Sequence, residues 1–262
     1  MKATENNYAL ITGATTGIGY ELAKLFAKDG FNVILVARTA EDLESVANEF
    51  RVTYGVTVIP IAKDLFNPEA AFELYDDIKA RGITVNILVN DAGQGVYGEF
   101  VDTDIRRQLK VIQLNISSLT ALTYLYLKDM VARNEGRILQ VASIVSESPA
   151  PLQSVYGGTK AYVLSFTEAL INEVKDTDVV ITSLQPGVTD TDFFNKAGAQ
   201  NTNMAQNKAN MSNPADVAKD GYEALMAGKR NVVSGFKNKM QSVMSHLLPD
   251  QVSAEQTRKQ TE

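Results

Sequence analysis

Three residues in the middle of the chain, Ser143, Tyr156 and Lys160, have side chains that can hold a small molecule and move a proton. Tyr156 and Lys160 stand one helical turn apart, so a helix would place both on one face. Tyrosine has an unperturbed pKa of about 10, and a neighbouring ammonium favours its phenolate. Ser143 would then hold a carbonyl oxygen while Tyr156 delivers the proton. A lone YxxxK pattern is also typical of an exposed helix face, so the hypothesis depends on the surrounding elements.

A glycine-rich turn near the N-terminus predicts a nucleotide site. The residues Thr12-Gly13-Ala14-Thr15-Thr16-Gly17-Ile18-Gly19 follow an apolar run and precede an amphipathic pattern through Leu22, Leu25 and Phe26. Glycines there let the backbone turn tightly and approach a pyrophosphate, which rests against the free N–H groups of a helix N-terminus. The spacing is GxxxGxG rather than GxGxxG, and three glycines can also serve a purely structural turn. Their position between a strand and a helix favours the nucleotide.

The end of the second apolar run predicts which nucleotide is bound. Dinucleotide folds that prefer NAD carry an acidic residue there, which accepts hydrogen bonds from ribose hydroxyls and would repel a 2′-phosphate. This chain has Ala37 at that position, followed by Arg38 and Thr39. A guanidinium can pair with a phosphate through two charge-assisted hydrogen bonds, so the sequence predicts NADP(H). The alternative is that Arg38 points into solvent while Thr39 and Asp42 cap the next helix.

The composition narrows the function classes. The 262 residues, 45% hydrophobic and 21% charged, can form one α/β domain with a full core. A net charge of -6 argues against a nucleic-acid partner or a membrane surface, because both need clustered Lys and Arg. The chain has no cysteine and a single histidine, His246, so no metal site is predicted. A place at a helix end suits His246 better than a Ser-His-Asp triad.

No targeting or membrane segment is expected. The N-terminal sequence MKATENNYALITGATTG lacks the pattern of a signal peptide, which predicts a cytoplasmic protein. The longest uncharged stretch, 111–127, contains several polar residues and is too short for a bilayer span. We interpret it as a buried or subunit-facing helix.

Apolar runs alternate with helical patterns along the chain. Runs without polar alternation are typical of strands covered on both faces, and crossovers between such strands are right-handed. We therefore predict an α/β, single-domain Rossmann fold over 1–262, with a doubly wound parallel seven-stranded sheet and helices on both faces. Its ligand crevice should lie beyond the carboxyl ends of the strands. The predicted strands are 8–12, 31–37, 56–62, 85–90, 136–143, 179–186 and 231–235.

Three further segments follow predicted strands at this crevice. Asn90-Asp91-Ala92-Gly93 forms a small-residue turn, which by itself could be a simple loop. Asp64, or the adjacent backbone of Leu65, could meet an adenine, although a solvated surface suits Asp64 equally. The polar stretch 198–213 is weakly patterned, and we interpret 188–213 as a mobile substrate lid. The alternative for this stretch is a plain surface loop.

With these motifs together, the chain resembles a short-chain dehydrogenase/reductase over nearly its whole length. TGATTGIG is similar to the family's TGxxxGIG, Asn90, Ala92 and Gly93 to its NNAG turn, and Ser143, Tyr156 and Lys160 to its active site. The segment 186–191 resembles the family's PG turn, which implies cofactor contacts there. The residues concerned are Pro186, Gly187, Thr189 and Thr191.

The resemblance also assigns a role to Asn115 and exposes two departures from the family pattern. By analogy Asn115 holds a water on a proton relay through Lys160 and the nicotinamide ribose, although an internal helix asparagine can also merely bond backbone. Asp91 replaces the usual second asparagine of the NNAG turn. Gly157 and Gly158 lie inside the active-site helix, at a cost on the order of 1 kcal/mol each relative to alanine.

The function implied is an NADP(H)-dependent oxidoreductase of the carbonyl-reductase-like branch, which reduces a ketone or aldehyde to an alcohol reversibly. One alternative is a 3-oxoacyl thioester reductase of the same family, which would need a basic patch at the site mouth. Another is an NADP-binding regulator without turnover, against which the complete catalytic set speaks.

The partners expected are a small-molecule substrate and further copies of the chain. The apolar helices at 105–130 and 156–174 predict a homodimer or homotetramer. Residues near the strand ends suggest a largely apolar substrate pocket, although each could equally be ordinary packing. The candidate wall residues are Gln94, Val96, Tyr97, Val145, Gln153, Phe193 and Phe194.

Overall fold

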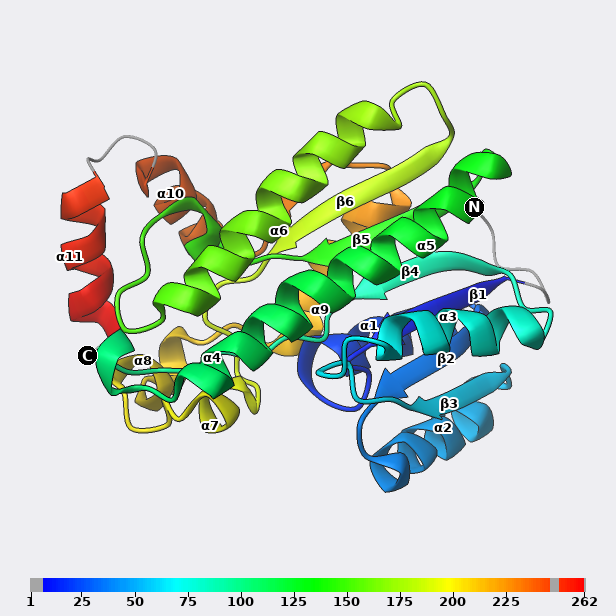
Figure 1. The fold of residues 1–262 in the computed structure, drawn as a ribbon, viewed down its shortest axis with the longest axis horizontal. Helices are drawn as coiled ribbons and strands as arrows, with labels where there is room; N and C mark the ends of the chain where they lie inside the picture. Colours follow the sequence, from blue (N-terminus) through cyan, green and yellow to red (C-terminus); the bar gives the residue numbers. More distant parts are fainter. Residues whose placement is uncertain (1–6, 246–249, 262) are drawn as a thin grey trace.

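The apolar runs of the chain form one parallel sheet in the order β3-β2-β1-β4-β5-β6-β7, drawn in Figure 1. This computed structural model describes residues 7–245 and 250–261. The predicted α/β, doubly wound seven-stranded fold is confirmed. The strands are β1 (Tyr8–Thr12), β2 (Asn32–Ala37), β3 (Val58–Ala62), β4 (Val85–Asn90), β5 (Gly136–Val141), β6 (Val179–Gln185) and β7 (Asn231–Val233).

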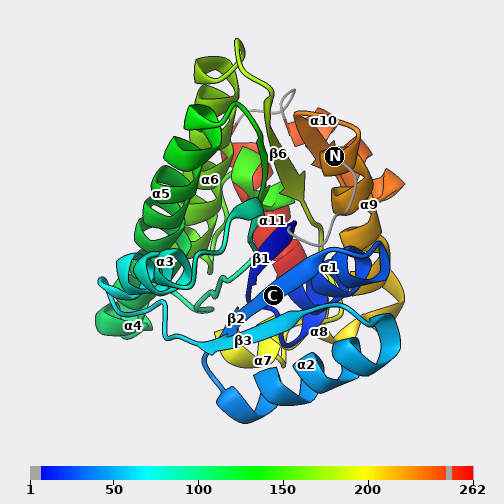
Figure 2. The same cartoon turned by 90° about the vertical axis from the view of Figure 1, so that its right-hand side faces the viewer.

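Helices cover both faces of the sheet, as Figure 2 shows. The helices α1, α2 and α9 pack on one face, where Phe26, Phe50 and Leu225 are buried. On the other face α3, α5 and α6 bury Leu74, Tyr126 and other apolar side chains. Both sides of the strands are therefore removed from water, which is why their sequences are apolar without alternation. The α-helices are α1 (Gly17–Lys28), α2 (Ala40–Tyr54), α3 (Ala70–Ala80), α4 (Ile105–Ile112), α5 (Leu119–Ala132), α6 (Ser154–Glu173), α7 (Phe193–Ala197), α8 (Asn203–Gln206), α9 (Pro214–Met226), α10 (Phe236–Ser245) and α11 (Asp250–Thr261).

The strand order reverses direction between β1 and β4, and this places the ligand crevice. Thr12 and Asn90, the last residues of these strands, pair directly across the sheet. The Thr12 hydroxyl accepts hydrogen bonds from Asp91 N at 3.1 Å and from Ala92 N at 3.0 Å. The two turns that follow the strands are thereby joined at the switch point, where open α/β sheets bind their ligands.

The predicted helix at 105–130 is interrupted. Residues Gln113–Ser118 form a π-helical segment between α4 and α5. Side-chain hydrogen bonds anchor both parts of this segment: Ser118 Oγ donates to Leu65 O at 2.7 Å, and Asn115 Nδ2 donates to Gln94 O at 2.9 Å. Such insertions are frequent at functional sites.

The segment 198–213 is more regular than its sequence suggests. It contains α8 and a 3₁₀ turn, Lys208–Asn210. Met204 and Met211 pack there against a small apolar cluster around Phe194, separate from the two cores of the sheet. The sparse apolar residues of this polar stretch are thus enough to fold it over the strand ends.

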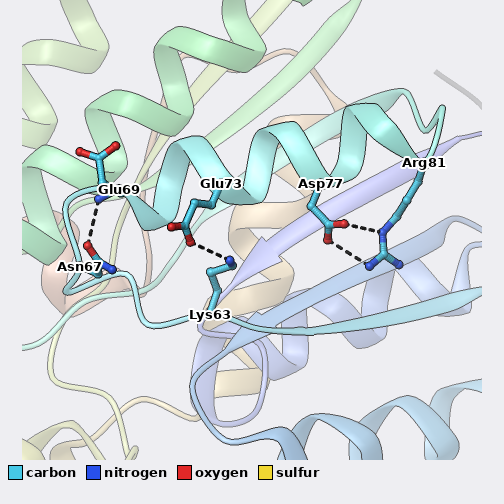
Figure 3. Close-up of polar contacts among 6 residues, drawn as sticks. All are labelled: Lys63, Asn67, Glu69, Glu73, Asp77 and Arg81. Atoms are coloured by element: carbon cyan, nitrogen blue, oxygen red, sulfur yellow. Dashed lines mark hydrogen bonds and ion pairs between the residues drawn. The ribbon is translucent and has the colours of Figure 1, made fainter.

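Helix α3 carries exposed polar pairs along its outer side, shown in Figure 3. Lys63 Nζ, just after β3, lies 2.9 Å from Glu73 Oε2, and Arg81 Nη2 lies 3.0 Å from Asp77 Oδ2. Exposed pairs of this kind contribute about 0–1 kcal/mol each. The pair with Glu73 also gives the Lys63 ammonium a partner within the protein.

The sequence predicts neither a membrane span nor a metal site, and the structure describes most of the chain in which these could occur. Within residues 7–245 and 250–261, no helix is long and apolar enough to cross a bilayer. No cluster of metal-ligating side chains occurs among the same residues. His246 and the first six residues of the N-terminal sequence lie outside the described residues.

Candidate active site

A cavity of about 1210 Å³ opens at the carboxyl ends of the strands. It is lined by the glycine turn, the ends of β2 and β3, the turn after β4, the Ser143 segment, α6 and the PG turn. Most of the predicted site residues face this cavity. Those that line it are Gly13, Thr15, Thr16, Gly17, Ile18, Arg38, Thr39, Asp64, Leu65, Ala92, Gly93, Gln94, Ser143, Val145, Gln153, Tyr156, Lys160, Pro186, Gly187, Thr189, Thr191, Phe193 and Phe194.

The glycine turn forms a cradle that side chains would fill. Gly13 and Gly17 have φ angles of +73° and +61°, which favour glycine. A Cβ on Gly19 would lie 2.4 Å from Gly13 O, so this residue serves the close approach of α1 to the turn rather than the cavity wall. Thr16 caps α1 without a side-chain hydrogen bond, and the first turn of α1 carries no acidic residue. The helix N-terminus therefore fits an anionic pyrophosphate.

Arg38 lies at the rim of the same cavity, directly after β2. Its guanidinium carbon stacks 5.5 Å from the centre of the Phe66 ring, an arrangement that holds the charged group in place. The alternative, a capping pair of Thr39 and Asp42, is not formed, because the Thr39 side chain accepts no cap hydrogen bond. Lys63 also lines the cavity but is paired with Glu73, whereas Arg38 forms no ion pair among the described residues, so Arg38 is the freer cation for a phosphate.

Ser143 and Tyr156 meet at the centre of the cavity. Ser143 follows β5 and caps a short 3₁₀ turn, Ile144–Glu147, accepting from Val145 N at 3.3 Å. Burial raises the pKa of Tyr156 to about 12, while a hydrogen bond from Ser143 lowers it and Asp91 raises it. In this state Tyr156 is a neutral phenol at neutral pH, which suits a proton donor.

Lys160 stands one turn further along α6 and is only 5% exposed. Its Nζ donates to Val141 O at 2.7 Å and lies 5.8 Å from the centre of the Tyr156 ring. Burial lowers the pKa of Lys160, and the Asp91 carboxylate raises it. The two side chains are thus neighbours along α6, but the charge of Lys160 is not among the causes that shift the pKa of Tyr156 in this structure.

Asn115 lies within the π-helical segment and does not line the cavity. Its Oδ1 accepts from Gln94 N at 3.0 Å, and its Nδ2 donates to Thr159 Oγ1 at 2.9 Å as well as to Gln94 O. The side chain is therefore occupied by protein partners, and it ties the turn after β4 to α6. A water on the expected proton relay would therefore have to bind a group other than the side-chain amide of Asn115.

Three other predicted contacts also lie behind the cavity wall. Asn90 Nδ2 donates to Thr123 Oγ1 and to Gln140 Oε1, both at 3.0 Å, so its side chain joins β4 to its neighbours instead of facing a cofactor. Tyr97 packs with the apolar cluster around Phe194, and Val96 is buried. These residues support the walls without touching the cavity.

Sequence reasoning missed several residues that shape the site. Gly95 lets Tyr156 and Phe193 come together, because a Cβ there would lie 2.9 Å from Phe193 Cζ and 3.4 Å from the Tyr156 ring. Thr257 and Lys259 of α11 line the cavity, and Figure 1 shows α11 beside α8. No signal in the sequence of α11 indicates this, whereas Gly95, two residues after the NNAG-like turn, could have been suspected from its position.

The chain is similar in sequence to known proteins. The family model described as short chain dehydrogenase matches residues 7–202. A very-long-chain 3-oxoacyl-CoA reductase from Anas platyrhynchos is 37% identical over 185 residues, which are 68% of this chain and 58% of that protein. A human 17-beta-hydroxysteroid dehydrogenase type 3 is 36% identical over 189 residues, 70% of this chain and 59% of the relative. The chain thus matches about three-fifths of the length of these relatives.

Solved structures share the fold. A short-chain dehydrogenase from Sphingobium yanoikuyae in complex with NADPH has a TM-score of 0.82 and 25% identity, covering 93% of this chain and 96% of that one. A 7beta-hydroxysteroid dehydrogenase structure has a TM-score of 0.88 at 24% identity, covering 98% of this chain and 99% of the other. The residues that the family model matches include most of the strands together with Ser143, Tyr156 and Lys160. This chain belongs to the short-chain dehydrogenase family of oxidoreductases.

Proposed function

We propose that the protein is an NADP(H)-dependent carbonyl reductase that converts a ketone or aldehyde to an alcohol, reversibly. The observation that carries the proposal is the meeting of Ser143, Tyr156 and Lys160 in the cavity that the glycine turn also lines. The glycine cradle, the N-terminus of α1, whose own first turn carries no acidic residue, and the guanidinium of Arg38 fit a dinucleotide with a 2′-phosphate. A relative of known structure is a complex with NADPH.

When bound, the nicotinamide supplies the hydride that reduces the carbonyl carbon. The Ser143 hydroxyl holds the carbonyl oxygen, and Tyr156 donates its proton to that oxygen as negative charge develops there. Lys160 stabilises the tyrosinate that is left and orients the ribose of the cofactor. Asn115 acts here by positioning: its amide fixes the turn after β4 against α6 through Gln94 and Thr159.

Lys160 serves both binding and turnover in this scheme, so Lys160→Ala is expected to damage both. Loss of one charge-assisted hydrogen bond, about 1.5–3 kcal/mol, raises the Kd for NADPH about 10- to 100-fold. Removal of the ammonium lowers kcat as well, because the Tyr156 phenolate loses its counter-charge. Fluorescence titration and steady-state kinetics separate the two effects. Lys175→Ala, just beyond α6, is the control, and an unchanged Kd for NADPH in Lys160→Ala would count against the double role.

A second candidate function is the reduction of a 3-oxoacyl thioester. Positively charged side chains at the cavity rim favour this function. Lys196, Lys237 and Lys259 line the cavity from α7, α10 and α11, although the chain as a whole is acidic. Lys196 is paired with Asp192 at 3.1 Å. A phosphate-bearing acyl carrier such as coenzyme A would find cations at this mouth. One relative carries the name of a 3-oxoacyl-CoA reductase.

The assay that tests the function is NADPH consumption with a panel of free ketones, aldehydes and 3-oxoacyl-CoA esters. A carbonyl reductase should turn over the free ketones and aldehydes. The double change Lys237→Ala with Lys259→Ala should leave this turnover unchanged. Thioester specificity predicts that the CoA esters are preferred and that this double change raises their KM. NADPH binding without consumption of any panel member would favour a binding protein without turnover.

The segment 188–213 is proposed to act as the lid over the substrate. It carries α7, α8 and the 3₁₀ turn, and Phe193, Phe194, Met204 and Met211 line the cavity from it. Backbone hydrogen bonds from Ser212 N to Val188 O at 2.8 Å and from Asp190 N to Ser212 O at 3.0 Å close the base of the segment.

The single-domain organisation over 1–262 and the cytoplasmic location remain predictions.

Self-association is expected through the exposed apolar residues of α4 and α5. Ile105 and Leu109 lie one turn apart and are 54% and 56% exposed, and Tyr124 is 63% exposed. A dimer or tetramer would cover these side chains. Light scattering at micromolar concentration should give a homodimer or homotetramer, and Leu109→Glu should shift it toward the monomer. A monomeric wild type would refute the prediction.

A further inference from the structure

Asp91 is the one charged residue of the turn after β4, and it stands where the family pattern has an asparagine. Its carboxylate lies beneath the glycine turn: Oδ2 would be 3.1 Å from a Cβ on Gly13 and 2.6 Å from one on Gly19. The Gly19 N–H, in the first turn of α1, donates to this carboxylate. Asp91 also lines the cavity, together with Tyr156 and Lys160. An acid at this place needs an explanation, because the same cradle fits an anionic pyrophosphate.

The explanation lies in the burial of Lys160. A buried ammonium is costly unless a negative charge compensates it. Among the described residues Lys160 forms no direct ion pair, and its Nζ hydrogen bond goes to the neutral Val141 carbonyl. The backbone of the Asp91 turn packs against this nitrogen: a Cβ on Gly93 would lie 3.4 Å from Lys160 Nζ and 3.7 Å from Asp91 O. The Asp91 side chain lines the same cavity as Lys160, and its carboxylate is the charge that raises the pKa of this lysine.

We propose that Asp91 is a positioning residue that holds the counter-charge of the buried Lys160 ammonium while anchoring the turn after β4 to the start of α1. The inference rests on the proposed function, in which Lys160 must carry a charge. An asparagine at this position would make the same contact with Gly19 but would leave the lysine uncompensated. The departure from the family pattern therefore adds charge without changing shape.

The groups that face Asp91 define the effect of its charge. From α6 these are Lys160 and Tyr156, from α1 the Gly19 N–H, and from β1 the Thr12 hydroxyl, which binds the Asp91 backbone. Burial raises the pKa of Asp91, and Lys160 lowers it. In return Asp91 raises the pKa of Lys160 and that of Tyr156. Removing this negative charge makes both groups lose their protons at lower pH.

The test is the pH dependence of Asp91→Asn. The amide keeps the size of the side chain and an acceptor for Gly19 N–H, and it removes only the charge. In carbonyl reduction with NADPH, kcat/KM falls on the alkaline side as the Tyr156 and Lys160 pair loses protons. In Asp91→Asn this fall is expected about one pH unit lower than in the wild type. The matched control is Asp76→Asn, which removes an exposed carboxylate of α3 that does not line the cavity, and it should leave the profile in place.

A structural role alone would give a different result. If Asp91 only anchors Gly19, the amide replaces it, and the pH profile of Asp91→Asn superimposes on that of the wild type; that outcome overturns the proposal. Should Asp91→Asn be too unstable to purify, Asp91→Ser makes the same change of charge in a smaller side chain and is judged by the same shift.

Binding keeps this test separate from the test of function. Fluorescence titration gives the Kd for NADPH at each pH, and the loss of affinity as Lys160 deprotonates should also move to lower pH in Asp91→Asn. A shift in binding without any carbonyl turnover contradicts the proposed function and supports the role of Asp91. Carbonyl turnover with unshifted profiles in both measurements supports the function and contradicts the role of Asp91.

Discussion

Replacing Tyr156 with phenylalanine is expected to lower kcat for carbonyl reduction by about 10³- to 10⁴-fold, the upper range of what a general acid contributes. The Kd for NADPH should change by less than about threefold, a small difference in binding free energy. The reason is that the ring keeps its contacts, including the one with Phe193 at a centroid distance of 5.0 Å, while the hydroxyl group that donates the proton is removed. Stopped-flow or steady-state NADPH oxidation measures the first quantity and fluorescence the second.

The control for this change is Tyr162→Phe on the same helix. Tyr162 shares a hydrogen bond with Thr120 at 3.0 Å and does not line the cavity, so loss of its hydroxyl should leave turnover intact. If Tyr156→Phe retained turnover within tenfold of the wild type, another group would have to be the acid.

The second large effect concerns the choice of cofactor. The wild type should favour NADPH over NADH by a factor on the order of 10² in kcat/KM, since a charge-assisted bond contributes roughly 1.5–3 kcal/mol. The double change Ala37→Asp with Arg38→Ile should reverse this preference. The new carboxylate at the end of β2 would accept the ribose hydroxyls of NADH and repel a 2′-phosphate.

The single change Arg38→Ile separates the two contributions. It should lower the efficiency with NADPH and leave that with NADH nearly as it was, because only the phosphate contact is lost. Equal efficiency of the wild type with the two cofactors would remove the role of Arg38, while the roles of Ser143, Tyr156 and Lys160 would stand.

The sheet could be predicted from the sequence because its strands are continuous apolar runs and its helices carry periodic patterns. The predicted strands overlap all seven observed ones, and the differences lie at the ends. The predicted strand 136–143 ends instead at Val141, because Ser143 already caps the following turn. Local hydrogen bonds of polar side chains decide such ends, and apolar periodicity does not report them.

The site was predictable where its residues belong to contiguous motifs. Glycine spacing, the residue after β2 and the Tyr156 and Lys160 pair each depend on local sequence, and the fold brings them to one cavity. Orientation was not predictable. Asn90 and Asn115 turn their amides toward protein partners, Thr123, Gln140, Gln94 and Thr159, that are far away in the sequence. The contact of Asp91 with Gly19 likewise exists only after the two turns meet at the switch point.

The most direct test of the central claim follows the hydrogen that is transferred. The protein is incubated with a reducible ketone and NADPH carrying deuterium on the transferring face of C4, and the alcohol is analysed by mass spectrometry. The account predicts that deuterium appears on the carbinol carbon of the product and that Tyr156→Phe slows its appearance by orders of magnitude. Binding of the labelled NADPH without deuterium in an alcohol, across the whole substrate panel including the CoA esters, would contradict it.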